Sequence, residues 1–464
     1  MRSRVVNLVG ALLSAAILAA CSGGSSGLSS STPISVAPQI AAPQSAAMAL
    51  QRLGPSFARQ RRASANYTSL YSFKGGKDGA NAEPVLIDAT GSLFGTTFAG
   101  GGPTCVGHDD DNAGCGTIFA VGTTGKNYKV LHRFPSNGKQ GAYPIFGVID
   151  ANGILYGTTI YGGGSGCSEF GGCGTVFEAL ATGKGYKALY SFKGGSDGAE
   201  SIDLTYAGGT LYGVTRLGGG GSCSTSDEPG CGTVFQVSPK SGSESVLHSF
   251  TAGSDGDYPV NVIDVNGELY GTTTAGGDTA CTGPSGVGCG IVFRISTSGK
   301  GYDVLYQFTG GTDGNGPNNV IDVKGTLFGT TVIGGGSGCN GAGCGTLFEL
   351  DPKSGKENIL YTFQGGTDGA YANNLVTDEN GTLYGTTAAG GGSGCGGGGC
   401  GTVFSISTAG KNCQVLYSFQ GGNDGATPYN GLTDVNGTLY GTTWAGGGSG
   451  CGSSGCGTVF KLTL

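Results

Sequence analysis

The chain repeats one unit seven times, and this repetition restricts its fold more than any other feature. Each unit carries three short motifs, one like LYGTT, one like GTVF and one like LYSF. The glycine of the LYGTT-like motif recurs every 56 to 62 residues, at Gly95, Gly157, Gly213, Gly271, Gly329, Gly385 and Gly441. The GTVF-like motif ends at Phe119, Phe177, Phe235, Phe293, Phe348, Phe404 and Phe460. The LYSF-like motif ends at Phe73, Phe134, Phe192, Phe250, Phe308, Phe363 and Phe419.

Every unit is predicted to form four short strands, here called a to d. In the sixth unit these are residues 374–378, 382–387, 401–406 and 414–419. Strands a and b are joined by Asn380 and Gly381, a pair preferred in tight hairpins because both positions tolerate positive φ. Four-stranded repeats of this length, apolar on both faces, are typical of the blades of a β-propeller.

The two ends of the repeat region complement each other. The region opens on a strand d at 68–73 and finishes on a strand c at 457–462. The last unit therefore lacks its own strand d, which the N-terminal strand can supply. We predict an all-β fold, a seven-bladed β-propeller over residues 67–464 that is closed by three strands plus one.

The composition agrees with an ordered β protein. Glycine accounts for 99 of 464 residues, a content that often indicates disorder. Disordered chains are poor in aromatic residues, however, and this one has 20 Phe and 20 Tyr. The net charge of -7, with no basic run in the repeat region, argues against a nucleic-acid partner.

The N-terminus has the pattern of an export signal. Residues 1–20 contain two arginines followed by an apolar run, which predicts a signal peptide. The ending Leu18-Ala19-Ala20-Cys21 resembles the lipobox of bacterial lipoproteins, which implies lipid attachment at Cys21; ordinary cleavage at Ala-x-Ala is the alternative. Residues 21–66 then form the lipidated cysteine and a flexible tether. We expect a lipid-anchored protein of the outer membrane or cell surface, with the membrane as a partner.

The repeated motifs resemble a known family. LYGTT, GGGSGC…CGTVF and VLYSF…GGxDG together are similar to the GloVer-type tandem repeat of bacterial "choice-of-anchor" surface proteins, over residues 67–464. The resemblance implies an exported, anchored repeat protein and no particular biochemical activity. The lipobox would be the anchor of this member.

Fourteen of the 16 cysteines form close pairs between strands b and c. The pairs are Cys105 with Cys115, Cys167 with Cys173, Cys223 with Cys231, Cys281 with Cys289, Cys339 with Cys344, Cys395 with Cys400, and Cys451 with Cys456. Zinc is the alternative, but the variable spacing and the separation of successive loops on different blades disfavour a tetrahedral site. Export makes disulfides the expected state. Cys413 stands where other units have tyrosine and is interpreted as a buried thiol.

The aspartate of the GGxDG-like motif recurs in six units. These residues are Asp78, Asp197, Asp255, Asp313, Asp368 and Asp424, with Gln140 in the remaining unit. A ring of carboxylates could bind Ca²⁺. We favour the simpler interpretation, that each side chain caps its own turn, and expect no metal or cofactor.

A ligand site is expected where the repetition breaks. The residue after GTT is Phe98, Ile160, Arg216, Thr274, Val332, Ala388 or Trp444. Ring closure places the blades of Trp444, Phe98, Ile160 and Arg216 next to one another. The same sector contains Tyr161 and the longest b–c loop, which carries His108, Asp109, Asp110, Asp111 and Asn112. Aromatic faces beside carboxylates predict carbohydrate or peptide binding; packing against the disulfide loops is the alternative.

A second candidate site is the mouth of the central channel. The starts of the a strands hold Asp203, Asn261, Asn318, Asn319, Asn373, Asn374 and Asn430. These amides could hold a sugar or ordered water, or could satisfy backbone groups where the innermost strands enter.

No constellation for catalysis is evident in the sequence. There are three histidines, and His132 and His248 replace the tyrosine of LYSF, so we expect them to pack in the core or at an interface. We therefore predict a monomeric binding or structural module. The alternative is a polysaccharide-active lyase or hydrolase that uses carboxylates on the face of the disulfide loops.

Overall fold

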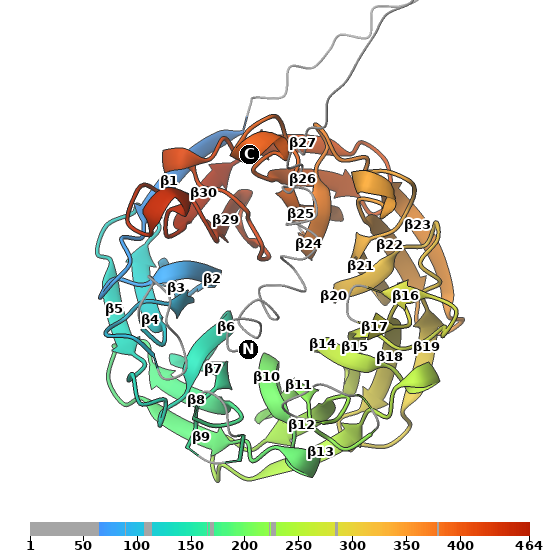
Figure 1. The fold of residues 1–464 in the computed structure, drawn as a ribbon, viewed down its shortest axis with the longest axis horizontal. Coiled ribbons are helices and arrows are strands. Elements are labelled where there is room, and N and C mark those ends of the chain that lie inside the picture. The colour runs from blue at the N-terminus through green and yellow to red at the C-terminus, as the bar shows by residue number, and fades with distance from the viewer. Residues whose placement is uncertain are drawn as a thin grey trace, which may run out of the picture.

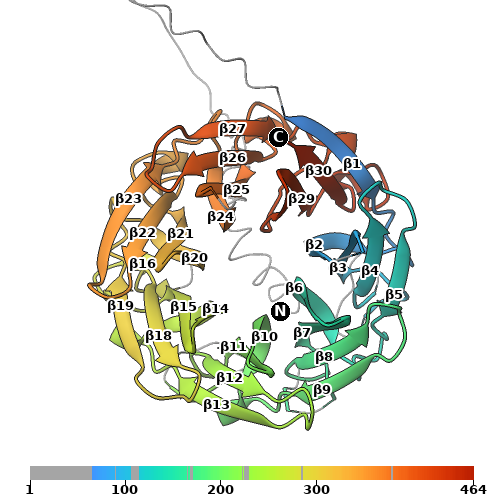
Figure 2. The same cartoon turned by 180° about the vertical axis from the view of Figure 1, so that it is seen from behind.

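The protein is a ring of four-stranded antiparallel sheets around a central axis (Figures 1 and 2). The predicted all-β, seven-bladed propeller is confirmed by this computed structural model, which carries seven such sheets. The structure describes residues 65–88, 90–105, 114–164, 166–167, 171–221, 223, 229–283, 286–377 and 380–464.

The blades are numbered by the order of their innermost strands. Blade 1 contains β2 (Ala80–Ile87), β3 (Ser92–Ala99), β4 (Thr117–Gly122) and β5 (Lys129–Arg133). Blade 2 contains β6 (Ala142–Ala151), β7 (Ile154–Tyr161), β8 (Thr175–Leu180) and β9 (Lys187–Ser191). Blade 3 contains β10 (Ala199–Ala207), β11 (Thr210–Leu217), β12 (Thr233–Val237) and β13 (Glu244–Ser249). Blade 4 contains β14 (Asp257–Val265), β15 (Glu268–Ala275), β18 (Ile291–Ser296) and β19 (Asp303–Gln307).

The remaining blades follow the same plan. Blade 5 contains β20 (Asn315–Val323), β21 (Thr326–Ile333), β22 (Thr346–Asp351) and β23 (Lys356–Thr362). Blade 6 contains β24 (Ala370–Thr377), β25 (Thr382–Ala389), β26 (Thr402–Ser407) and β27 (Gln414–Ser418). Blade 7 contains β28 (Thr433–Val435), β29 (Thr438–Thr443), β30 (Thr458–Thr463) and β1 (Asn66–Ser72).

Short strands and helical turns lie in the loops. β16 (Thr282–Gly283) and β17 (Gly286–Val287) form a small hairpin. The helical turns are η1 (Gly195–Asp197), η2 (Gly253–Asp255), η3 (Cys339–Gly341), η4 (Cys395–Gly397), η5 (Gly422–Asp424) and η6 (Gly452–Ser454). Among the described residues, no helix has the length and apolar character needed to cross a membrane.

The N-terminal strand closes the ring as predicted. β1 pairs antiparallel with β30, with Tyr67 opposite Leu462 and Thr68 opposite Lys461. The Tyr67 ring stacks on Tyr417 of blade 6, with centroids 4.2 Å apart. The closing strand is therefore held both by its own blade and by the neighbouring one.

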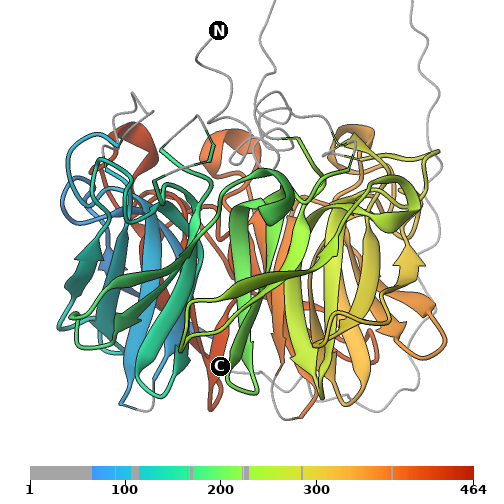
Figure 3. The same cartoon turned by 90° about the horizontal axis from the view of Figure 1, so that it is seen from below.

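The propeller has two different faces, visible in the side view of Figure 3. The disulfide face carries the loops between the second and third strands of each blade and the helical turns. The hairpin face carries the turns between first and second strands, such as Asn152 and Gly153, which have φ of 59° and 82°. β1 begins and β30 ends on the hairpin face, because Asn66 and Thr438 both pair with Thr463.

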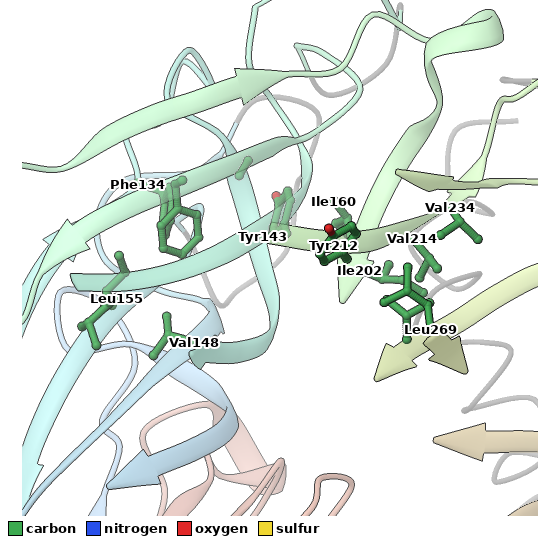
Figure 4. Packing of buried hydrophobic residues seen from close by; sticks show 14 of the residues in the cluster. Phe134, Tyr143, Val148, Leu155, Ile160, Ile202, Tyr212, Val214, Val234 and Leu269 are labelled. Atoms are coloured by element: carbon green, nitrogen blue, oxygen red, sulfur yellow. The ribbon is translucent and has the colours of Figure 1, made fainter. Parts of the chain in front are cut away.

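The core lies within and between the blades, and the LYGTT and GTVF motifs meet there. In blade 6, Gly385 lies opposite Phe404, whose side chain is fully buried. A Cβ at Gly385 would lie 2.5 Å from Cζ of this ring, so glycine is needed to make room for the phenylalanine. Figure 4 shows side chains from successive blades in contact, for example Val214 of β11 and Leu269 of β15. The repeated Gly and Phe are thus packing partners.

Candidate functional site

Each blade is entered through a residue in the left-handed conformation, which comes just before or at the start of its first strand. These seven bridge residues have φ between 55° and 63°, and six of them carry a side chain. The backbone N–H of each donates to the carbonyl oxygen of the second cysteine of the preceding blade, at 2.8 to 3.1 Å. The bridge residues are Asn81, Tyr143, Glu200, Tyr258, Gly316, Tyr371 and Thr427. A left-handed L-residue costs about 1–2 kcal/mol, so this conformation is maintained by the contact between blades.

The predicted disulfides are confirmed at all seven pairs, and zinc binding by these cysteines is not supported. The bonds join Cys105 to Cys115, Cys167 to Cys173, Cys223 to Cys231, Cys281 to Cys289, Cys339 to Cys344, Cys395 to Cys400, and Cys451 to Cys456. The paired Cα atoms lie 5.0 to 5.7 Å apart.

The second cysteine of each pair anchors the next blade. The carbonyl oxygens that accept the bridge N–H groups belong to Cys115, Cys173, Cys231, Cys289, Cys344, Cys400 and Cys456. In blade 1, for example, the disulfide closes the loop whose Cys115 carbonyl accepts the Tyr143 N–H of blade 2. The disulfides therefore fix the positions of the bridge residues that follow them.

An arc of aromatic side chains crosses the disulfide face over blades 7, 1 and 2. The ring centroids of Trp444 and Phe98 are 5.4 Å apart, and those of Phe98 and Tyr143 are 5.0 Å apart. Tyr429 lies 5.8 Å from Trp444 at one end, and Tyr161 lies 6.0 Å from Tyr143 at the other. Tyr143 is buried, whereas the other four are partly exposed. We call these five residues the aromatic arc.

A polar cluster continues the arc into blades 3 and 4. The hydroxyl of Tyr161 donates to Glu200 Oε1 at 3.2 Å. Glu200 Oε2 in turn accepts from Arg216 at 3.4 Å, and each of these two side chains is 12% exposed. The Arg216 guanidinium lies over the ring of Tyr258, 5.3 Å from its centroid. The structure therefore connects the predicted residues Trp444, Phe98, Tyr161 and Arg216 along one sector.

Asp257 is the third charged group of this polar cluster, which we define as Glu200, Arg216 and Asp257. Burial raises the pKa of Asp257 to about 7, although a backbone hydrogen bond with Tyr258 and the charge of Arg216 lower it. Its Oδ1 is buried and has no hydrogen-bond partner among the described residues. Asp257, Cys223 and Cys231 are close enough to share an ion, but both sulfurs belong to a disulfide and are not thiolates.

Half of this sector lies at positions that the sequence did not single out. The residue after GTT locates Trp444, Phe98 and Arg216, whereas Tyr143, Glu200 and Tyr258 stand at the bridge position, where the units also differ. Asp257 stands where five other blades have alanine. Comparison of the units at these two further positions would have found these four residues, whereas Tyr429 of the aromatic arc stands at neither position.

Several predicted residues lie outside the described part of the chain. This holds for the lipidation site Cys21, for the tether, and for the loop residues His108, Asp109, Asp110, Asp111 and Asn112.

The amides at the channel mouth bind backbone groups of the next blade. Asn318 Nδ2 donates to the Ala372 carbonyl at 2.7 Å, and Asn373 Nδ2 donates to the Pro428 carbonyl at 2.9 Å. Asn430 Nδ2 donates to the Ala82 carbonyl at 3.3 Å. These contacts support the interpretation that the amides satisfy the innermost strands.

The remaining members of that set make other contacts, and Asn319 Oδ1 is buried without a hydrogen-bond partner among the described residues. Asn261 Oδ1 accepts from Thr272 of its own blade at 3.0 Å, and Asp203 Oδ2 accepts the Val262 N–H at 3.1 Å. Burial raises the pKa of Asp203 to about 7. Asn374 is half-buried and its Cβ lies against the backbone position of Gly431.

Glu83 is a buried acid at the same level that the sequence did not indicate. It is 3% exposed, and its Oε2 accepts the Phe146 N–H at 3.2 Å. Burial raises the pKa of Glu83 to about 8, although hydrogen bonds from Phe146 and the Asn430 amide lower it. Glu83 therefore links blades 7, 1 and 2 at the point where the ring closes.

The recurring GGxDG aspartates act within their turns. Asp424 Oδ2 accepts the Gln420 N–H at 2.7 Å, and its Oδ1 accepts the Tyr417 hydroxyl at 2.5 Å. The same two bonds occur at Asp78, where the donors are Lys74 and Tyr71. These bonds support the interpretation that the aspartates cap their turns.

The outer seams between blades are formed by stacked rings. His132 stacks on Tyr186 and His248 stacks on Tyr302, with centroids 3.8 and 3.7 Å apart. In blade 6 the place of Tyr186 and Tyr302 is taken by Cys413, which is half-buried, and burial raises the pKa of its thiol.

The sequence comparisons agree with the repeat architecture. The Gloeobacter/Verrucomicrobia repeat matches residues 57–227 and 221–460. The chain belongs to this family. A search of curated proteins gives no match. The repeat family and the disulfides together indicate an extracellular or surface protein.

Three solved structures resemble the chain distantly. A computationally designed protein called Ika8 is 11% identical, with a TM-score of 0.45 over 85% of this chain and 99% of that one. An oligogalacturonate lyase in complex with manganese is 9% identical, with a TM-score of 0.46 over 87% and 98%. TolB from Acinetobacter baumannii is 12% identical, with a TM-score of 0.39 over 73% and 66%. Likenesses of this size carry no information about the ligand or the activity of this chain.

Proposed function

We propose that this Gloeobacter/Verrucomicrobia repeat protein is an extracytoplasmic binding module that holds a carbohydrate on its disulfide face. The observation that carries the proposal is the aromatic arc, in which every ring lies within about 6 Å of the next across blades 7, 1 and 2. In the other sector the residue after GTT is Thr274, Val332 or Ala388. The seven-fold scaffold thus has one differentiated side.

The chemistry of the arc suits a sugar chain. Partly exposed rings such as Trp444 and Phe98 offer flat apolar surfaces that pack against the C–H faces of pyranose rings. The polar cluster next to Tyr161 supplies donors and acceptors for hydroxyl groups. A peptide ligand would use the same rings and is distinguished by the experiment below.

The point at which the N-terminal strand enters the propeller supports an orientation in which the aromatic arc faces away from a membrane. β1 begins on the hairpin face, opposite the aromatic arc. A lipid on Cys21 would place the hairpin face, where the chain enters the propeller, on the side of an outer-membrane or surface anchor. The disulfide face would then point to the surroundings of a monomeric module.

Polysaccharide cleavage by a lyase or hydrolase is the second candidate. The observation that favours it is the pair of carboxylates at the end of the arc. Glu200 is paired with Arg216, whereas burial raises the pKa of Asp257 to about 7, so the two acids are placed in contrasting environments.

A thermal-shift screen of the full chain tests the proposed function. The panel contains neutral, acidic and amino oligosaccharides and a set of unrelated peptides, and released reducing ends are measured in parallel. We expect a higher melting temperature with a class of oligosaccharides and no release of reducing ends. Stabilisation by peptides alone would contradict carbohydrate binding, and release of products would establish the enzyme.

A further inference from the structure

The polar cluster combines unused donors with an unused acceptor. The contact with Glu200 is the one hydrogen bond that the Arg216 guanidinium makes within the described residues, and at 3.4 Å it is long. A guanidinium has five N–H donors, so most of those on Arg216 remain unmatched there. In the same part of the chain that the structure describes, Asp257 Oδ1 is buried without a partner, and Asp257 as a whole is 9% exposed. Buried polar groups normally have partners, which indicates that a ligand completes this set.

The ligand must both donate and accept. An anionic group would satisfy Arg216 but would lie against Glu200 and Asp257. An ammonium group would satisfy the carboxylates but would meet the guanidinium and leave its donors unmatched. A hydroxyl group donates one hydrogen bond and accepts others, so it matches both kinds of group.

The position of the polar cluster at the end of the aromatic arc indicates which kind of hydroxyl compound would bind. Tyr161 belongs to the aromatic arc, and its hydroxyl donates to Glu200. Tyr258 lies beneath the Arg216 guanidinium and holds it in place. A chain of pyranose units stacked along the arc would therefore place its end unit over the polar cluster. Resting on the proposed carbohydrate function, we propose that Glu200, Arg216 and Asp257 form the subsite for the hydroxyl groups of an uncharged terminal sugar unit.

The other blades show which residues can replace Asp257 and Arg216 without disturbing the fold. Asp257 stands where blades 1, 2, 3, 6 and 7 have Ala80, Ala142, Ala199, Ala370 and Ala426. Arg216 stands where blade 4 has Thr274. Asp257→Ala and Arg216→Thr therefore remove the polar groups with residues that occur at the same places in the ring. Asn315→Ala, at the position of Asp257 but in blade 5, is the matched control, because Asn315 Oδ1 is also buried without a partner among the described residues but lies outside the sector of the aromatic arc.

The experiment is isothermal titration of the full chain with three kinds of hexasaccharide probe. They are uncharged cello-, manno- and xylo-oligosaccharides, anionic oligogalacturonate, and cationic chitosan oligosaccharide. We expect binding of an uncharged probe, a loss of affinity of about tenfold or more in Asp257→Ala and in Arg216→Thr, and no change in Asn315→Ala. Melting temperatures of all variants confirm that the fold is intact.

The contrary results separate the subsite from the wider function. Preference for a charged probe, or unchanged affinity in both variants, would overturn the subsite. If Trp444→Ala abolishes binding in the same series, the carbohydrate function stands even when the subsite fails. If no saccharide binds the unmodified chain, both proposals are wrong.

Discussion

Trp444 of blade 7 and Phe98 of blade 1 face each other across the seam where the ring closes, with ring centroids 5.4 Å apart. They are 346 positions apart in the sequence (444 minus 98) and meet only because β1 completes blade 7. The Trp444 carbonyl also accepts a hydrogen bond from the side chain of Asn81, a bridge residue of blade 1. The contact between Trp444 and Phe98 in the aromatic arc therefore forms only when the propeller closes.

Weakening the closing strand should destabilise the whole ring. Tyr67 stacks on Tyr417, packs edge-on against Phe419 and donates its hydroxyl to the Asp424 carbonyl. We expect Tyr67→Ala to lower the free energy of unfolding by about 2–4 kcal/mol, because a large ring and a hydrogen bond between blades are lost. Urea denaturation followed by circular dichroism measures this change.

The control for Tyr67 is Tyr206, which belongs to β10 of blade 3 and not to the closing strand. Tyr206→Ala, at a side chain that is 40% exposed, should alter the unfolding free energy by about 0.5 kcal/mol or less. Equal effects of the two substitutions would show that β1 does not lock the ring.

Two adjacent glycines in one loop should respond in opposite ways. Gly399 has φ of 75°, and an added Cβ would lie 2.1 Å from the Gly390 carbonyl oxygen. Gly398 has φ of -85° and no atom within 4 Å of an added Cβ. We expect Gly399→Ala to destabilise by more than about 2 kcal/mol and Gly398→Ala to change stability by about 0.5 kcal/mol or less. Melting curves of the two variants provide the test, and similar values would contradict this loop structure.

These glycines also show what the sequence can and cannot predict. The blade number, the closure and the disulfides could be predicted from the repeated motifs, because all seven units carry the same local sequence pattern. Residues 396–399, however, are all glycine, so the sequence does not show which of them must be glycine. Gly399 must be glycine because the backbone of Gly390 lies too close for a Cβ. Likewise the roles of Glu83 and the bridge residues depend on neighbouring blades, which a motif in a single unit does not encode.

The buried acid at the closing seam should make stability depend on pH. Folded Glu83 keeps its proton up to about pH 8, whereas the ordinary pKa is 4.5. Between these values the folded state binds more protons than the unfolded state. Stability from this group is therefore fully present below about pH 4.5 and is lost as the pH rises to about 8, with a slope of up to about 1.4 kcal/mol per unit.

Glu83→Gln keeps the hydrogen-bonding shape and removes the titration. We expect this variant to unfold less readily than the native chain at pH 8 and to match it near pH 4.5, measured by urea denaturation across this range. Glu349→Gln, at an exposed hydrogen bond to Asn358, is the control and should leave the pH profile unchanged. If the stability of Glu83→Gln changed with pH in the same way as that of the native chain, the raised pKa of Glu83 would be refuted.

The GGxDG aspartates should stabilise turns without a metal ion. Asp424→Ala removes the acceptor of both the Gln420 N–H and the Tyr417 hydroxyl, and we expect a loss of about 1–2 kcal/mol. Addition of EDTA to the native chain should not change the melting temperature. A fall in melting temperature with EDTA, reversed by Ca²⁺, would show that the carboxylates hold calcium.

The most direct test of the central claim is calorimetric titration of the best saccharide from the thermal-shift screen into Trp444→Ala. Val332→Ala, at the same position in blade 5, is the matched control. Loss of one exposed stacking ring should weaken binding about tenfold or more in Trp444→Ala, with an unchanged melting temperature, and Val332→Ala should bind like the native chain. Equal affinities for the native chain and Trp444→Ala would contradict a carbohydrate site on the aromatic arc.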